Sequence, residues 1–207
     1  MENDPLAMGL VAQLLAARLP DLRIVGRLDS GFDTLDHRLA HPQAADLILM
    51  DMHLGDIDGP KVTWQLRHAG DATPVLGMTS LPLNRYDQAL RIAGAQGLRS
   101  KRDIAGIVAL LPRIARGGAC DGYETAADAV RRIGAQTHSM TILTPTQGRI
   151  MDLMDRGYSD DDIAERLGCS PATVRKHRQH ALKRLGVGNA REGVSKWRHL
   201  NRMFGLD

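Results

Sequence analysis

The stretch "ADLILMDMHLGDIDGP", residues 45–60, decides the fold class of the first half of the chain. It holds five apolar residues around one aspartate, Asp51, and turn-forming residues follow it. A short apolar run of this kind is typical of a strand buried on both faces, as strands of parallel sheets are. A carboxylate at the end of such a strand costs free energy unless something uses it. Asp51 is therefore the first candidate functional residue.

Strand and helix patterns alternate on both sides of this stretch. The patterns predict strands at 22–28, 46–52, 73–80 and 96–100, and helices at 10–19, 31–40, 59–69, 85–94 and 103–116. Such alternation predicts an α/β domain, with a doubly wound parallel sheet covered by helices on both faces. From Thr144 onward the patterns are helical only, so we expect an all-α domain to follow.

Three glycines in "GGACDG" (117–122) interrupt the alternation, and "YETAADAVRRIGAQ" after them favours a linker helix. The chain is accordingly divided into a first domain over 1–116, a linker over 117–139 and a second domain over 140–207. Residues 1–136 carry 15 Lys and Arg against 16 Asp and Glu, whereas residues 137–207 carry 12 against 8. The basic excess of the second part favours a polyanionic partner there.

The composition excludes several classes of protein. No apolar run approaches a membrane span, and the N-terminus lacks the basic start and apolar core of a signal peptide. The two cysteines, Cys120 and Cys169, have no metal-type spacing and argue against a disulfide framework. We therefore expect a cytoplasmic protein without a membrane partner.

Polar side chains stand where the predicted strands end. Asp51 ends one strand, Thr79 ends the next, and Lys101 follows the last. Because ligands of open α/β sheets gather at the carboxyl ends of the strands, these three groups are expected at one edge. An aspartate can act as a nucleophile toward a phosphoryl group, and a divalent cation held by oxygen ligands would neutralise the developing charge.

Three motifs in register, "LILMDMHLGDIDG", "VLGMTS" and "GAQGLRSK", resemble those of response-regulator receiver domains over residues 1–116. The resemblance implies a phosphoacceptor Asp51, switch residues Thr79 and Lys101, and Mg²⁺ held by Glu2, Asp51 and the backbone carbonyl of His53. It also implies a sensor histidine kinase as partner and no catalytic residues.

The chain departs from the receiver pattern at several places. Asn3 replaces one acidic metal ligand, Leu98 stands at the aromatic switch position, and Gly55 replaces a proline. The first strand of the receiver, which would be central in the sheet, is expected to be missing, since Glu2 and Asn3 stand where that strand should end. We expect the sheet formed by residues 1–116 to be incomplete and poorly stable unless it borrows a strand.

Three helix starts follow in the C-terminal part. Thr144 to Gln147 is a capping box with proline at the first helical position, and Ser159 and Ser170 are N-cap candidates. Gly168 permits a sharp turn between the second and third helices. The third helix has no acidic residue from Ser170 to Leu185 and is strongly basic, which favours contacts with phosphates and base edges.

Residues 140–200 resemble the LuxR/NarL-type helix-turn-helix domain, with "ATVRKHRQHALKRLGV" as the recognition helix. The resemblance places Arg175, Lys176 and Gln179 toward bases. We expect Lys183 and Arg184 to meet phosphates on double-stranded DNA, with Val174, Ala181 and Leu185 on the packed side. The DNA-binding residues are then predicted to be Arg175, Lys176, Arg178, Gln179, Lys183 and Arg184.

Together these features predict a transcriptional response regulator, not an enzyme, that is controlled by phosphorylation of Asp51 and binds DNA as a homodimer. RNA polymerase is a further candidate partner. The alternative is an atypical receiver, never phosphorylated, that a partner or small ligand governs. An aspartyl-phosphate phosphatase is disfavoured because that class needs a second aspartate where this chain has His53.

Overall fold

The computed structural model describes every residue except 3, 42–43, 55–56, 137–142 and 203–207. The chain divides into two compact units, Met1–Gln136 and Thr137–Asp207. In the part of the chain that is described, no helix is long and apolar enough to cross a membrane.

The first unit is built on a parallel sheet. Its described strands are β1 (Ile48–Asp51), β2 (Val75–Thr79) and β3 (Gly97–Ser100), hydrogen-bonded in that order. Every residue of β2 is buried, as the central position among these three strands requires. The structure confirms the predicted fold class and the strands predicted at 46–52, 73–80 and 96–100, with ends shifted by one to two residues.

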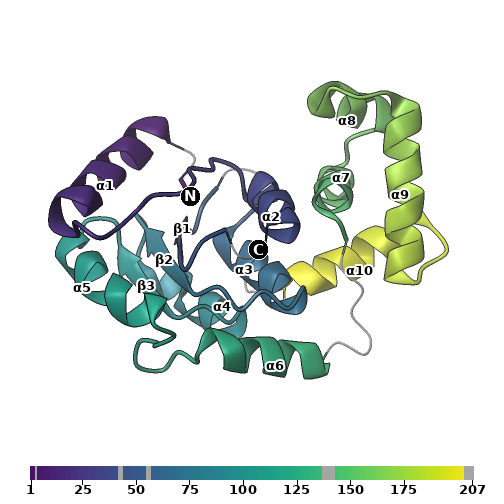
Figure 1. The fold of residues 1–207 in the computed structure, drawn as a ribbon. Helices are drawn as coiled ribbons and strands as arrows, with labels where there is room; N and C mark the ends of the chain where they lie inside the picture. The colour runs from purple at the N-terminus through teal and green to yellow at the C-terminus, as the bar shows by residue number, and fades with distance from the viewer. Residues whose placement is uncertain (3, 42–43, 55–56, 137–142, 203–207) are drawn as a thin grey trace. The chain divides into compact units, whose positions relative to one another are not determined.

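Helices cover both faces of this sheet (Figure 1). One layer holds α1 (Pro5–Arg18) and α5 (Ile104–Ala115), and the other holds α2 (Gly31–Ala40), α3 (Gly59–His68) and α4 (Asp87–Ile92), with a short 3₁₀ turn, η1 (Leu83–Arg85), before α4. On the first face, Leu15, Met78 and Ile107 belong to one buried cluster. On the second face, Leu90 of α4 lies so close to the sheet that a Cβ at position 77 would come within 2.6 Å of its side chain.

The strand predicted at 22–28 is wrong. Residues 22–28 form no strand, and Ile24 and Val25 are 37% and 55% exposed. A strand needs a neighbour to pair its backbone groups with. The backbone hydrogen bonds from this segment to described residues outside it lie at its two ends, from Leu22 N–H to Leu19 O at 3.0 Å and from Glu2 N–H to Leu28 O at 3.1 Å. Ile24 and Val25 therefore lie at the surface despite the strand-like pattern, whereas Leu22 packs against the buried cluster.

The segment after α5 packs on the first unit. Its helix α6 (Ala126–Gln136) contacts α3, and the N–H of Cys120 donates to the carbonyl of Gln96 at 2.8 Å. Gly94, at φ +81°, allows the approach, since a Cβ there would lie 2.5 Å from that of Ala129. Most of the segment expected to be a linker is thus bonded to the sheet and its helices.

A buried arginine organises the amino-terminal edge of the sheet. Arg67 of α3 donates to the carbonyl of Gly94 at 2.9 Å and to the side chain of Gln96 at 3.0 Å. The same Gln96 oxygen accepts from Val75 N–H at 2.7 Å, where β2 begins. Burial lowers the pKa of Arg67 to about 10, so the guanidinium stays charged at neutral pH. These bonds satisfy a charge that would otherwise be costly to bury.

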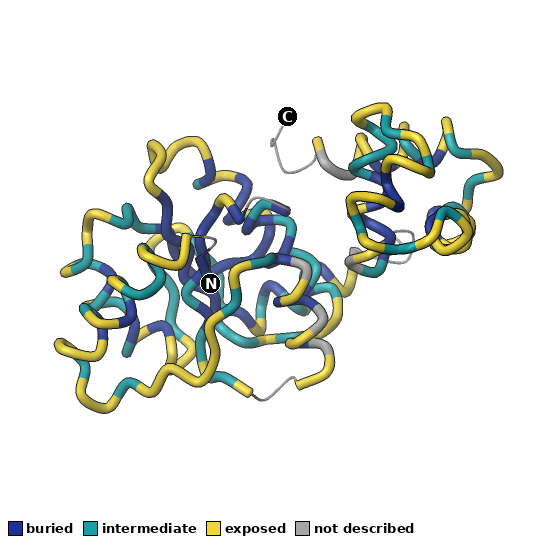
Figure 2. Tube along the Cα trace, turned by 90° about the horizontal axis from the view of Figure 1, so that it is seen from above, coloured by how far each residue is buried: buried dark blue, intermediate teal, exposed yellow. Residues whose placement is uncertain are grey.

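The second unit consists of helices, which are α7 (Pro145–Asp155), α8 (Asp160–Leu167), α9 (Pro171–Leu185) and α10 (Ala190–Arg202) in the described residues. Thr144, Ser159 and Ser170 cap their helices as predicted, and Thr144 forms the expected capping box with Gln147. Gly168 takes the left-handed conformation, at φ +64°, that the turn between α8 and α9 requires. Buried residues concentrate inside each unit (Figure 2).

Candidate functional site

The carboxyl ends of the three strands bring the predicted residues of the first unit together. Lys101, directly after β3, places its Nζ 2.9 Å from Oδ2 of Asp51 and 2.6 Å from Oε2 of Glu2. Both carboxylates are almost fully buried, with side-chain exposures of 5% and 2%. The structure thus gathers three of the predicted residues into one buried cluster of two carboxylates and one ammonium.

Glu2 reaches this cluster because the first two residues run alongside β1. The nitrogen of Met1 donates to the carbonyl of Leu49 at 2.8 Å, and Asp51 N–H donates to the carbonyl of Met1 at 3.1 Å. This is the bonding of a parallel strand pair, one residue long. It holds the Glu2 backbone beside the end of β1.

Two buried carboxylates, Glu2 and Asp51, share the ammonium of Lys101, and the amino group of Met1, whose pKa burial lowers, is a second cation nearby. Burial raises the pKa of Asp51, and the charge of Glu2 adds to this, although the hydrogen bond and charge of Lys101 oppose it. Burial alone would lower the pKa of Lys101, but its hydrogen bonds to Asp51 and Glu2 outweigh burial and raise it. Among the described residues, Lys101 is the one side-chain cation that contacts both buried carboxylates, and the carboxylate oxygens can also bind a metal cation.

The donor atoms fit a hard divalent cation such as Mg²⁺, which prefers oxygen ligands and few protein carboxylates. Glu2 and Asp51 supply two carboxylates at one edge. His53 follows Asp51 closely, and its backbone N–H donates to the Asp51 carboxylate, so the His53 backbone lies at the same edge of the sheet. Over the described residues, no group of three or more His, Cys, Asp and Glu side chains gathers as a metal site, so a bound ion would need backbone or water ligands.

The other predicted residues of this edge are placed as follows. Thr79 ends β2, is 1% exposed, and its hydroxyl oxygen accepts from Leu81 N–H at 3.1 Å. Leu98 is buried in β3. The exposed ring of His53 lies 3.5 Å from a carboxylate oxygen of Asp58. Asn3 and Gly55 lie outside the described residues.

The third helix of the second unit, α9, has a buried and an exposed side. Val174, Ala181 and Leu185 are buried, as predicted for the packed side. The exposed residues of the predicted DNA-binding set are Arg175, Lys176, Gln179, Lys183 and Arg184. This side is a basic surface of the size and shape that enters a major groove.

Arg178 differs from the rest of that set. Its guanidinium is half-buried and forms an ion pair with Asp160, at the start of α8. The pair ties α9 to α8, and a DNA phosphate at this position would have to share the guanidinium with Asp160. Sequence spacing does not predict this pair, because the two residues stand 18 positions apart.

A second interaction that the sequence analysis did not foresee joins α4 to the segment before α6. The hydroxyl of Tyr123 donates to Asp87 at 2.7 Å, and the guanidinium carbon of Arg91 lies 4.4 Å from the centre of the Tyr123 ring. Arg91 also donates to Asp87 at 2.8 Å and to the carbonyl of Gly122. We call Asp87, Arg91 and Tyr123 the α4 clasp. It attaches residues 122–123 to α4.

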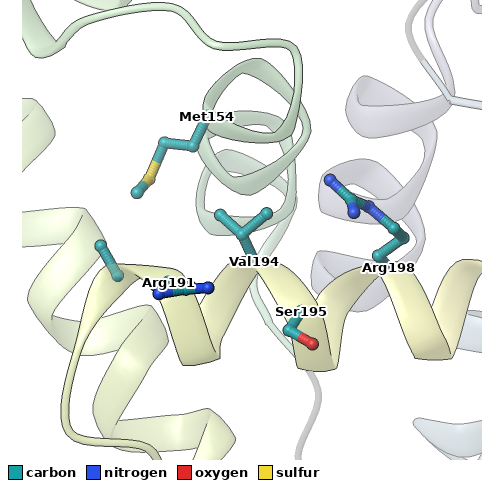
Figure 3. A pocket seen from close by; sticks show the side chains of 6 residues that line it. Met154, Arg191, Val194, Ser195 and Arg198 are labelled. Carbon is teal, nitrogen blue, oxygen red and sulfur yellow. The ribbon is translucent and has the colours of Figure 1, made fainter.

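The second unit also contains a shallow pocket of about 510 Å³ between α7 and α10. Figure 3 shows Met154 reaching from α7 toward Val194 of α10, with Arg191 and Arg198 on either side. Arg198 is already bonded to Asp155. None of the residues predicted to bind DNA lines this pocket.

Both units are similar to domains of known proteins. Residues 1–111 match the model of the response regulator receiver domain, and residues 141–196 match that of the bacterial regulatory proteins of the luxR family. The transcriptional regulatory protein UhpA of Salmonella typhimurium is 33% identical over 179 residues, which cover 86% of this chain and 85% of UhpA. The response regulator VraR of Staphylococcus aureus is 28% identical, covering 84% of this chain and 83% of VraR. Among solved structures, the response regulator ChrA aligns with a TM-score of 0.49 and 22% identity over 97% of this chain and 94% of ChrA.

Proposed function

Because the chain belongs to the response regulators that join a receiver domain to a LuxR-type DNA-binding domain, we propose that a phosphoryl group on Asp51 controls its binding to DNA. The observation that carries this proposal is the buried cluster at the carboxyl edge of the sheet. It gives Asp51 a cationic neighbour, Lys101, at 2.9 Å and a second carboxylate, Glu2, that shares the same ammonium.

The chemistry is a phosphoryl transfer from a phosphohistidine of a sensor histidine kinase. An oxygen of the Asp51 carboxylate forms a bond to phosphorus while the bond from phosphorus to the histidine nitrogen breaks, and the released imidazole takes up a proton. Glu2, Asp51 and the carbonyl of His53 would hold Mg²⁺, which supplies charge neutralisation at the phosphoryl oxygens when bound. Lys101 is placed to pair with those oxygens, since its ammonium already contacts Asp51.

The added phosphoryl group changes the charge balance at the edge. It brings a charge of about −1.5 to −2, which draws Lys101 and the hydroxyl of Thr79 toward Asp51. The N–H of Lys101 is bonded to the carbonyl of Thr79 at 2.8 Å, so the two residues respond together. The α4 clasp gives this response a route to the segment that leads to the second unit.

The output is DNA binding through α9 in the cytoplasm. Arg175, Lys176 and Gln179 contact base edges, and Lys183 and Arg184 contact phosphates. Two copies of the chain read half-sites about one helical turn apart, the spacing expected of dimeric helix-turn-helix proteins. RNA polymerase is the expected further partner at a promoter, and the chain itself carries out no enzymatic turnover.

The test is phosphorylation of the full chain with acetyl phosphate and Mg²⁺, followed by mass spectrometry and by DNA-binding titration. We expect one phosphoryl group, located on Asp51, none in Asp51→Asn, and an unchanged amount in Asp58→Asn. Asp58 is a suitable control, because it lies near the same edge and pairs with His53 rather than with Lys101. Equal labelling of the Asp51→Asn variant, or labelling without any change in DNA binding, contradicts the proposal.

A second candidate function is control by a small ligand in place of phosphorylation. One observation favours it, namely a pocket in the first unit that lies against the α4 clasp and away from Asp51. A regulator that is phosphorylated can also have such a pocket. Experiments, and not the presence of the pocket, therefore distinguish control by phosphorylation from control by a ligand.

A further inference from the structure

The pocket of about 330 Å³ in the first unit lies between η1, α4, β3, α5 and the segment around Tyr123. This volume is at the small end of the range of pockets that bind metabolites. One wall exists only because the segment after α5 is bonded in place. Tyr123 donates to Asp87, and Cys120 N–H donates to the carbonyl of Gln96.

The lining combines an apolar part with cationic side chains. Leu83, Leu98 and Leu110 line it from three different elements, together with the ring of Tyr123. Leu98 is 2% exposed and forms a fixed base. An apolar surface of this kind favours a ligand with a hydrocarbon or aromatic body.

Two arginines of the lining, Arg99 and Arg113, are available to an anion. In the described residues, neither forms an ion pair with a carboxylate, and Arg99 donates only to the carbonyl of its neighbour Leu98. The third arginine, Arg91, is neutralised by Asp87 within the α4 clasp. One further carboxylate, Asp121, lines the pocket and is exposed, so the lining keeps a net positive charge.

We propose that this pocket binds a small organic anion, with its apolar body against Leu83, Leu98 and Leu110 and its acidic group at Arg99 and Arg113. Arginine is suited to this role because its fork of donors matches a carboxylate or phosphate. The ligand would touch Tyr123, whose hydroxyl bonds α4 to the segment leading out of the receiver. A bound ligand would therefore contact the same α4 clasp that we propose to transmit the effect of phosphorylation.

The experiment measures binding of naphthoate, an aromatic carboxylate, to the full chain by isothermal titration calorimetry, with naphthamide as its uncharged counterpart. We expect naphthoate to bind with one molecule per chain and naphthamide to bind at least about tenfold more weakly, as expected when a charge-assisted hydrogen bond is lost. Arg99→Gln and Arg113→Gln should each weaken naphthoate binding by about tenfold or more.

Arg116→Gln is the matched control, because Arg116 is exposed just after α5 and does not line the pocket. It should bind naphthoate as the unaltered chain does. Melting temperatures establish that the variants are folded, and labelling of Asp51 by acetyl phosphate should be the same in all of them. Failure to bind naphthoate, equal affinity for the amide, or unchanged affinity in both pocket variants overturns the pocket proposal and leaves the phosphorylation proposal standing.

Discussion

Replacing Lys101 by methionine tests the electrostatics of the carboxyl edge most directly. The change keeps an unbranched side chain, one atom shorter, and removes the one ammonium that contacts both Asp51 and Glu2. Removing one partner of a buried ion pair typically costs about 3–5 kcal/mol, because the remaining charge stays buried without compensation. The Lys101 side chain is 18% exposed, so water offsets part of this cost and we expect about 3 kcal/mol. In a chain of this size that lowers the melting temperature by roughly 6–12 °C.

The pH dependence of the free energy of unfolding provides a second test of the same electrostatic argument. The pKa of Asp51 is raised above its ordinary value of 3.8 by burial, so the folded chain binds this proton more tightly than the unfolded chain. Protonation therefore stabilises the folded state, and the free energy of unfolding rises as the pH falls through the raised pKa toward the ordinary value of 3.8. Without Lys101 the pKa of Asp51 should rise further. Among the described groups, the amino group of Met1 is then the one cation that remains near the two carboxylates. The deficit of Lys101→Met should thus shrink on acidification.

The assay is thermal and urea unfolding of the full chain between neutral and mildly acidic pH. Asp51→Asn on its own and combined with Lys101→Met completes a double-mutant cycle. The combined variant should recover at least about 1 kcal/mol relative to Lys101→Met, since only one carboxylate then lacks its partner. A loss below about 0.5 kcal/mol for Lys101→Met, or a combined variant that shows simple additivity, refutes the reasoning.

Three further predictions concern α9, the α4 clasp and the docking of α6. Lys176→Ala should lose about 1–3 kcal/mol of binding free energy on the specific site and much less on random DNA. Lys183→Ala should weaken both about equally and reduce the salt slope by about one unit, so similar behaviour of the two variants would show the groove assignment to be wrong. Tyr123→Phe keeps the ring but removes the hydrogen bond to Asp87, and urea unfolding should show a loss of about 0.5–1.5 kcal/mol; a loss near zero argues against the clasp. Gly94→Ala should destabilise the first unit by about 1–3 kcal/mol, because φ is +81° and the new Cβ meets Ala129, and an unchanged melting temperature would mean that α6 does not pack there.

Much of the fold follows from local patterns. The helix predicted at 31–40 has the predicted bounds, and the capping residues of the second unit were assigned correctly, because a cap depends on residues three positions apart. The helix predicted at 10–19 instead begins at Pro5, where Asp4 accepts from Leu6 N–H and Ala7 N–H. The strand at 22–28 failed because a strand depends on a distant neighbour, and its apolar pattern carries no information about whether one is present.

In the candidate site, too, some contacts could be predicted from the sequence and others could not. The meeting of Asp51 and Lys101 was predictable, since parallel strands end at one edge whatever lies between them. The sharing of Lys101 between Asp51 and Glu2 was not, because it depends on how residues 1–2 pair with β1. The pairing of Arg178 with Asp160 and that of Tyr123 with Asp87 join separate elements, and side chains of this kind find partners that sequence spacing does not encode.

The two ends of the sheet differ in what holds them together, because the buried hydrogen bonds of Arg67 lie at only one of them. At the amino-terminal end, Arg67 locks Gly94 and Gln96 together, and Gln96 also reaches the carbonyl of Glu124 at 3.4 Å. These bonds hold the segment that leads out of the receiver at the amino-terminal end of the sheet. The opposite, carboxyl-terminal end holds the cluster of Glu2, Asp51 and Lys101. Helix α4 connects β2 to β3 between these two ends. A substitution that removes the bonds of Arg67 should therefore loosen the outgoing segment while leaving the residues of the carboxyl-edge cluster and of α9 unchanged.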